Sequence, residues 1–575
     1  MKSKLALPLI PIALAVALSP LHAADLIWGG GDHNWSDTSA TGWNGTLPAG
    51  GDSITITSGS ITLTTNNLPN GLSATTIGGT GKITQTNENT WGAFNNLILS
   101  GGTLESVRVS EDVFGSYQIS NTVTVTGTSA STISTNGSGR IFINLGNAVS
   151  DTPTFTTFNV SDATSSAASD LNVSTVLGNN IANNFVSQSA AGLIKTGEGT
   201  MTLSANNTYT GGTTVNAGVL TINGSNSGNS FIRGTVNVNS GAELRYTGGD
   251  GTGFGFNDGN RLNTININDG LVQSEGSMTH LWGATVNMTG GELRVNNGVS
   301  SSTGLRIEWF QNTLNTLASA DMAVISGRIN LRGDGGNNNE TFNVADGSAA
   351  TDLLISAAIT QDFGSVGITK AGTGTLELSG ANLFTGNTIV QQGQLVVNGS
   401  IANASTTTVQ NGAILSGSGS LGSLTVNAGG SVNPGNSPGV LTVNGAYNQA
   451  GSLVAEITGL NAGTQHDQLI VNGSVNLSGE LNVQFSGLTS YALNDTIFLI
   501  LNDESDAVSG TFFGLNQGDV AATYGGWDWV ISYDANSSTS SFSGGNDVAL
   551  RAIPEPSAAL LGGLGILGLL RRRRN

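Results

Sequence analysis

GLIKTGEGTMTLSANNTYTGGTTVNAGVLTINGS (residues 192–225) and GITKAGTGTLELSGANLFTGNTIVQQGQLVVNGS (residues 367–400) are two copies of one pattern, and that pattern decides the fold. In each copy, short stretches alternate Thr or Asn with Val, Ile or Leu and then break at a glycine. A period of two is typical of a β-strand with one buried face, and glycine suits the turn that follows. The copies therefore predict short strands joined by tight turns.

The same unit recurs outside the two copies. TININDGLV (264–272), TVNMTGGELRV (285–295) and TVQNGAIL (408–415) each place a glycine between two alternating stretches. Neighbouring turn glycines lie 17 to 29 residues apart, so one coil has about 20 residues. A coil that short must stack on the next one to bury its apolar face. We expect an all-β, elongated parallel β-helix (a β-solenoid) of about 20 coils and about 100 Å, with strands about 4.8 Å apart.

A larger duplication divides the chain. WGAFNNLILSGGTLE (91–105) corresponds to WGATVNMTGGELR (282–294), and the offset between the copies becomes smaller toward the end of the repeats. Solenoid loops tolerate such length changes, whereas stacked strands do not. The expected segments are a signal peptide (1–23), a Trp-rich cap with the first coils (24–90), a first block (91–225), intervening coils (226–281), a second block (282–400), a C-terminal β region (401–552) and a sorting signal (553–575).

The two copies resemble the autotransporter-associated β-strand repeat, K-x-G-x-G-x-x-x-L-S-x-x-N-x-[YF]-[TS]-G. Residues 427–447 and 466–483 are similar to the end of an autotransporter passenger. The resemblance implies a β-helical passenger displayed outside the cell. In that family a translocator barrel follows the passenger, whereas this chain continues into a different terminal signal, so we expect another route of export.

The N-terminal segment 1–23 has the three parts of a secretory signal peptide in order. Lys2 and Lys4 precede an apolar run over 5–18, and Ala23 offers a small residue for cleavage before Ala24. We therefore expect export through the Sec machinery. A short buried strand or helix is the alternative interpretation of the apolar run.

The C-terminal segment combines a short motif, an apolar run over 557–570 and a basic cluster. The motif and the cluster are Pro554, Glu555, Pro556, Arg571, Arg572, Arg573 and Arg574. As a helix the run would be about 21 Å long, against about 30 Å of hydrocarbon core. The arginines would stay on the cytoplasmic side and stop transfer.

This arrangement resembles the PEP-CTERM sorting signal of Gram-negative bacteria. The resemblance implies an exosortase that cleaves near the motif, transient membrane contact through the apolar sorting helix, and release or transfer to the cell surface. A plain tail anchor is the alternative.

Composition excludes several classes of function. The formal net charge is −19, which disfavours nucleic acid as a partner. The absence of cysteine excludes disulfides and thiolate chemistry. Hydrophobic residues reach 38% despite 83 glycines, which favours a folded repeat over a disordered chain.

Candidate catalytic or metal-binding groups are few and scattered. The mature histidines are far apart in sequence without metal spacing, and His466 and Asp467 would point to opposite faces if they lay in a strand. Lys195 and Lys370 occupy the same place in two repeats, which favours a structural role. The acidic stretches 334–337 and 503–506 fit solvated turns better than calcium loops, and Arg-Gly-Asp at 332–334 fits a chance match. We predict no catalytic, metal or cofactor-binding residue.

Two further patterns bear on the surface. Trp28, Trp35 and Trp43 predict a cap over the first coil, with stacking on sugars as the alternative. The Asn-Gly pairs at 223–224, 398–399, 444–445 and 472–473 predict turns with positive φ. Stacked Asn and Thr would leave a polar face on which polysaccharide could lie.

These observations predict an exported, exosortase-sorted structural or interaction protein of the cell surface or extracellular matrix. It would be adhesin-like, with exopolysaccharide or other copies of itself as candidate partners. The alternative is a carbohydrate-active β-helix enzyme, a polysaccharide lyase or hydrolase, because the fold alone does not forbid catalysis.

Overall fold

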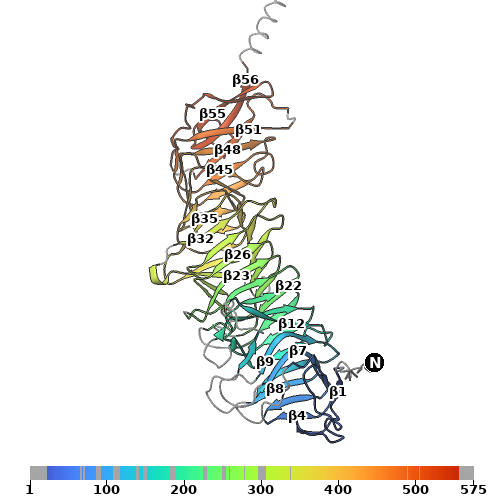
Figure 1. Cartoon of the computed structure of the whole chain (residues 1–575). Coiled ribbons are helices and arrows are strands. Elements are labelled where there is room, and N and C mark those ends of the chain that lie inside the picture. Colours follow the sequence, from blue (N-terminus) through green and yellow to red (C-terminus); the bar gives the residue numbers. More distant parts are fainter. Residues whose placement is uncertain are drawn as a thin grey trace, which may run out of the picture.

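The protein forms a long rod in the computed structural model (Figure 1). The structure describes residues 23–555 except 65–67, 69–70, 86–91, 108–116, 137–141, 147–151, 182–187, 225–228, 249–253, 258, 277–278, 296–305, 337–338, 488–489 and 504–505. Strands follow one another along the axis, from the blue N-terminal end to the red C-terminal end (Figure 1). The predicted parallel β-helix is confirmed.

Two long parallel sheets form the first two faces. In the described ranges the first face has 22 strands, and each pairs with strands of the neighbouring coils. The first repeat shows the unit: it places Leu193 beside Thr213 on one face and Met201 beside Leu220 on the other. Its strands are β17 (Ala191–Thr196), β18 (Thr200–Leu203), β19 (Thr213–Val215) and β20 (Gly218–Ile222), and those of the second repeat are β35 (Gly367–Ala371), β36 (Thr375–Leu378), β38 (Thr388–Val390) and β39 (Gln394–Val397).

Coil length varies more than the glycine spacing predicts. Partners on neighbouring coils are close in sequence where Thr407 lies opposite Leu424, and more than twice as far apart where Thr156 lies opposite Leu193. The longer coil lies in the first block, where the short strands β15 (Asn180–Ile181) and β16 (Gln188–Ser189) form a separate antiparallel pair. Loop insertions therefore account for the range of coil lengths.

The core is a continuous column of aliphatic side chains. In β18 and β20 the inward residues Met201, Leu203, Leu220 and Ile222 have no exposed surface, and they lie in register on adjacent coils. Each coil buries its apolar face only against its neighbours, which is how solenoids gain stability. One cluster of buried residues runs from Trp28 to Ala552.

A third parallel face appears in the middle of the rod. Its side chains come into register across coils, so His280 lies opposite Glu308, and Glu308 opposite Asn330. Its strands are β25 (Thr279–Trp282), β28 (Ile307–Phe310), β31 (Arg328–Arg332) and β34 (Ala358–Asp362). Further along the rod a third face continues in a separate nine-stranded sheet that includes β46 (Val440–Val443), β49 (Gln468–Val471) and β52 (Thr496–Asn502).

The tryptophan-rich segment forms the first coil of the rod. Strands β1 (Asp25–Ile27) and β2 (His33–Asn34) pair with the next coil on the two faces. Trp28, Trp35 and Trp43 are buried, and Trp43 packs edge-on at 5.0 and 5.1 Å from the other two indole rings. Their rings are therefore closed to sugars, which contradicts the stacking alternative.

The C-terminal end departs from parallel pairing. β52 pairs antiparallel with β56 (Asp547–Pro554), which pairs antiparallel with β55 (Trp527–Ala535), and β55 pairs with β54 (Val520–Tyr524). A reversed sheet can end a solenoid because it occupies an edge that would otherwise template another chain. The described residues contain no helix long and apolar enough to span a membrane. The apolar run 557–570 lies outside them.

The prediction of positive φ at the Asn-Gly pairs is wrong. None of Gly224, Gly399, Gly445 and Gly473 has positive φ. At Gly399 an added Cβ would lie 2.1 Å from the carbonyl oxygen of Gly380 on the preceding coil. Glycine is needed there for close approach of stacked backbones. The left-handed turns lie instead at glycines between the two faces, as at Gly218 and Gly393.

Candidate functional site

The lysine of the first repeat is a buried residue that links two stacked coils. Lys195 has no exposed surface, and its Nζ donates hydrogen bonds to the carbonyl oxygens of Thr196 at 3.0 Å, Gly197 at 2.6 Å and Ala217 at 3.0 Å. Ala217 lies on the next coil, directly before the left-handed Gly218. The ammonium group therefore joins the turns of two stacked coils.

The second repeat reproduces this arrangement. Lys370 donates to the carbonyl oxygens of Ala371 at 3.1 Å, Gly372 at 2.8 Å and Gln392 at 3.0 Å. Burial lowers the pKa of both lysine ammonium groups to about 8, although nearby carboxylates oppose the shift. Each ammonium group donates to three backbone oxygens. This geometry supports the structural role predicted for the two lysines.

A buried asparagine also joins the coils in each repeat. Asn207 Oδ1 accepts from the Leu177 amide at 2.9 Å, and Asn207 Nδ2 donates to the Phe231 carbonyl at 3.0 Å. Asn382 likewise accepts from an amide of the coil before it and donates to a carbonyl of the coil after it. The lysine and asparagine of the motif thus serve coil stacking.

Outside the core, asparagines form a ladder along the first face. Each side-chain amide donates to the side-chain oxygen of the preceding coil, at 2.7, 2.8, 3.0 and 3.2 Å in turn, through Asn237, Asn266, Asn287, Asn315 and Asn343. Hydrogen bonds along the ladder occupy one donor and one acceptor of each inner amide. The predicted stacking of polar residues is present, and it reinforces the rod.

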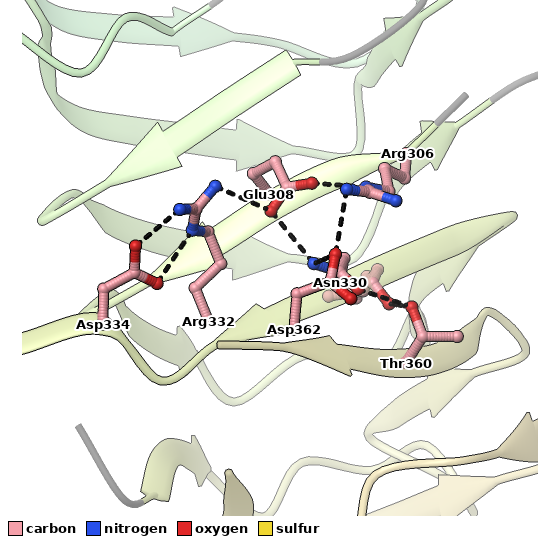
Figure 2. A network of polar contacts seen from close by, with 8 residues as sticks. Arg306, Glu308, Asn330, Arg332, Asp334, Thr360 and Asp362 are labelled. Carbon is pink, nitrogen blue, oxygen red and sulfur yellow. Dashed lines mark hydrogen bonds and ion pairs between the residues drawn. The ribbon is translucent and has the colours of Figure 1, made fainter. Parts of the chain in front are cut away.

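The third face carries a network of charged and polar side chains (Figure 2). Glu308 is fully buried beneath Arg306 and Arg332. Its Oε1 accepts from Arg306, and its Oε2 lies 3.0 Å from Asn330 Nδ2 and 3.5 Å from an Arg332 nitrogen. Asp362 accepts from Arg306 at 3.0 Å and from Asn330 at 3.2 Å. The network therefore adds side-chain contacts across three consecutive coils to their backbone pairing.

Aromatic rings adjoin this network at one end. The Arg332 guanidinium lies 5.1 Å from the Trp282 ring centroid and 4.3 Å from that of Phe363. The Trp282 ring lies 5.0 Å from that of Phe310 on the next coil. We call Trp282, Phe310, Arg332, Asp362 and Phe363 the third-face ledge.

Sequence reasoning missed the third-face ledge and treated part of it as chance. In Arg332-Gly333-Asp334 the arginine pairs with its own aspartate, with nitrogen–oxygen distances of 3.0 and 2.5 Å, so the tripeptide is a structural turn. A signal was available, since charged residues are only 10% of the chain and yet several lie between 306 and 334. Without the coil register, that local excess could not be assigned to one surface.

His466 and Asp467 lie outside the strands, in the turn between β48 (Ser452–Ile457) and β49, so the opposite faces expected for a strand do not apply to them. Both are buried. Asp467 accepts from the Gly439 and Glu456 amides at 2.9 Å each, and burial raises the pKa of its carboxyl to about 6. Asp467 also lines a polar surface cavity of about 290 Å³.

The remaining candidate ligands are dispersed. Burial lowers the pKa of His466, and His33 lies at the N-terminal end, where it is 3.4 Å from Asp37. Asp334 is engaged by Arg332, and the stretch 503–506 lies partly outside the described residues. Within the described part of the chain, no group of three His, Asp or Glu could hold a metal ion.

The processing residues lie at the two ends of the rod. Ala24 is tied to the second coil: its amide donates to Asp52 at 2.8 Å, and its carbonyl accepts from Ser53 at 2.9 Å. Pro554 is the last residue of β56 and lies opposite Trp527. Glu555 follows the strand directly. Residues 1–22, Pro556 and Arg571 to Arg574 lie outside the described residues.

The passenger-associated-transport-repeat family matches residues 193–222 and 368–397, the two stretches that hold the buried lysines. The PEP-CTERM protein-sorting motif matches residues 552–574. The chain carries both signatures. The passenger repeats therefore coincide with the stacked coils, and the sorting motif begins inside β56.

Two curated proteins share parts of this sequence. The adhesin BmaC autotransporter of Brucella suis biovar 1 (strain 1330) is 29% identical over 238 residues, which are 35% of this chain and 7% of that protein. An extracellular serine protease of Serratia marcescens is 46% identical over 77 residues, 13% of this chain and 7% of that protein. The chain thus spans only a small part of the length of either relative.

Among solved structures, the Hap adhesin of Haemophilus influenzae aligns with a TM-score of 0.29 and 14% identity, covering 88% of this chain and 59% of that one. The parallel register of strands on successive coils shows the solenoid fold.

Proposed function

We propose that the protein is an exported, adhesin-like rod of the cell surface or extracellular matrix, and that its role is structural and interactive. One observation carries the proposal: passenger repeats that build a stacked solenoid share a chain with a sorting motif that starts at the end of the last strand. The partial similarity to an adhesin autotransporter supports it. The sorting motif implies processing by an exosortase. In this proposal, export by the Sec machinery and a membrane-tethered stage precede that processing.

Cell fractionation combined with intact mass tests this proposal. Wild-type protein from the surface or medium should begin at Ala24 and lack the arginine cluster. A variant with Pro554, Glu555 and Pro556 all replaced by alanine should keep its tail and stay with the membrane. Alanine at Asn536, Ser537 and Ser538, in a turn of the same end, is the matched control and should be processed normally. Native wild-type protein outside the cell that still carries Arg571 to Arg574 would refute the proposal.

We also propose that the protein is not an enzyme, although the structure does bring carboxylates and arginines together on the third face. Both oxygens of Glu308 are held by arginine or asparagine, and both oxygens of Asp467 are held by backbone amides. Groups committed in this way are poorly placed to transfer protons to a substrate. Release of reducing ends or unsaturated products from polysaccharide by the purified protein, lost in Glu308→Gln, would establish the enzyme alternative instead.

A further inference from the structure

Phe363 combines backbone strain with exposure. Its φ is 59°, in the left-handed region that bulky residues avoid, and its side chain is 66% exposed. Such strain persists where surrounding structure enforces it, and it clusters at functional sites. Here the neighbouring coil lies close against this backbone, since a Cβ added at Gly333 would lie 2.6 Å from the Phe363 carbonyl oxygen.

A nearby residue shows what a purely structural left-handed position looks like. Gln311 has a φ of 52°, and its amide donates to the buried Glu340 at 2.7 Å, while the next amide donates to the same carboxylate at 3.1 Å. Strain at Gln311 thus accompanies a buried polar contact. The Phe363 ring instead faces solvent and covers one side of the Arg332 guanidinium.

The third-face ledge presents apolar rings beside hydrogen-bonding groups. Trp282 and Phe310 stand on successive coils, so their 5.0 Å separation is close to the strand spacing. Asp362 keeps 41% of its side chain exposed, and Arg306 keeps 22%. A pyranose ring has an apolar C–H face for such rings and equatorial hydroxyls for carboxylate and guanidinium.

We propose that the third-face ledge binds a segment of neutral polysaccharide, with Phe363 as an exposed stacking residue and Asp362 as a hydroxyl partner. The charges argue for a neutral chain. The two arginines of the network face Glu308, Asp334 and Asp362, and the whole protein is acidic, so a polyanion meets no net positive surface. This inference rests on the proposed function in that such a glycan is met outside the cell.

Calorimetric titration of purified protein spanning residues 24–555 tests the proposal. The probes are cellohexaose, laminarihexaose, maltohexaose and dextran, with oligogalacturonate as the anionic comparison. We expect at least one neutral probe to bind, and Phe363→Ala to weaken that binding by about tenfold or more. Phe513→Ala is the matched control, because Phe513 is 77% exposed and lies in the C-terminal part of the rod, and this variant should bind as wild type does.

Phe363→Gly separates recognition from folding. Glycine accepts positive φ without strain, so this variant should have a Tm equal to or above that of wild type while its binding falls as in Phe363→Ala. A lower Tm with unchanged binding would make Phe363 a structural residue and overturn the proposal. So would binding of oligogalacturonate alone, no binding of any neutral probe, or self-association through the ledge. None of these results affects the export and sorting test, which follows mass and location.

Discussion

Lys195 and Lys370 lie far apart in sequence and occupy the same place in two coils, where each ammonium nitrogen donates to three backbone carbonyls. In both, the acceptor most distant in sequence is the residue before a left-handed glycine on the next coil. The passenger repeat thus joins consecutive coils through a buried cation. No disulfide assists this joining, since the chain has no cysteine.

Replacing the buried lysine should destabilise the rod. Lys195→Met keeps much of the volume but removes the hydrogen bonds that the ammonium donates to three carbonyl oxygens, so we expect a loss of about 2 kcal/mol in the free energy of unfolding. Chemical denaturation monitored by circular dichroism measures it. Lys82→Met is the control, because Lys82 forms a partly exposed pair with Glu105 and should change stability by less than about 1 kcal/mol. Equal losses of stability in Lys195→Met and Lys82→Met would contradict the linking role of Lys195.

Stability should rise with pH above about 8. The folded state holds both buried lysines at a pKa of about 8, whereas an unfolded lysine titrates near about 10.4. The unfolded chain therefore binds more protons between these values, and raising the pH favours the folded state. The rise should be measured as Tm between about pH 8 and 9.5, below the range in which buried tyrosines such as Tyr117 begin to oppose it. The Lys195→Met, Lys370→Met double variant should show a flatter profile.

Breaking the third-face network should be costly. Glu308→Gln leaves Arg306 and Arg332 without their shared buried carboxylate, and we expect a loss of about 3 kcal/mol. Glu243→Gln removes a more exposed pair with Arg245 and should cost less than about 1 kcal/mol. Denaturant midpoints of the two variants give the comparison. If Glu308→Gln behaves like Glu243→Gln, the network contributes little to stability.

Removal of the sorting tail should leave the fold intact. A chain ending at residue 555 retains β56 and should unfold at the same temperature as the full-length protein. A chain ending at residue 546 loses the strand that buries Val548, Leu550 and Ala552 and pairs with both β52 and β55, so its Tm should fall by several degrees. Calorimetry of both chains is the measurement, and an unchanged Tm for the shorter one would show that β56 is dispensable.

The sequence alone determined the coil. Alternating residues such as Thr213 and Val215, followed by the turn at Gly218, specify a strand with one buried face and a turn, and such a unit is stable only when stacked. The equivalence of Lys195 and Lys370 and the sorting motif could also be predicted, because they depend on duplication or on local pattern.

Only the tertiary structure decided which side chains of separate coils meet. His280, Glu308, Asn330 and Thr360 are well separated in sequence, yet they form one row across four coils. Loop lengths set that register, and loops leave no periodic signal in the sequence. The same holds for Gly399, whose constraint is a carbonyl of the neighbouring coil, and for β56, which reverses direction because it covers the last open edge. The local sequence specifies the strands and turns of each coil, whereas the alignment of the coils decides which side chains lie side by side on the surface.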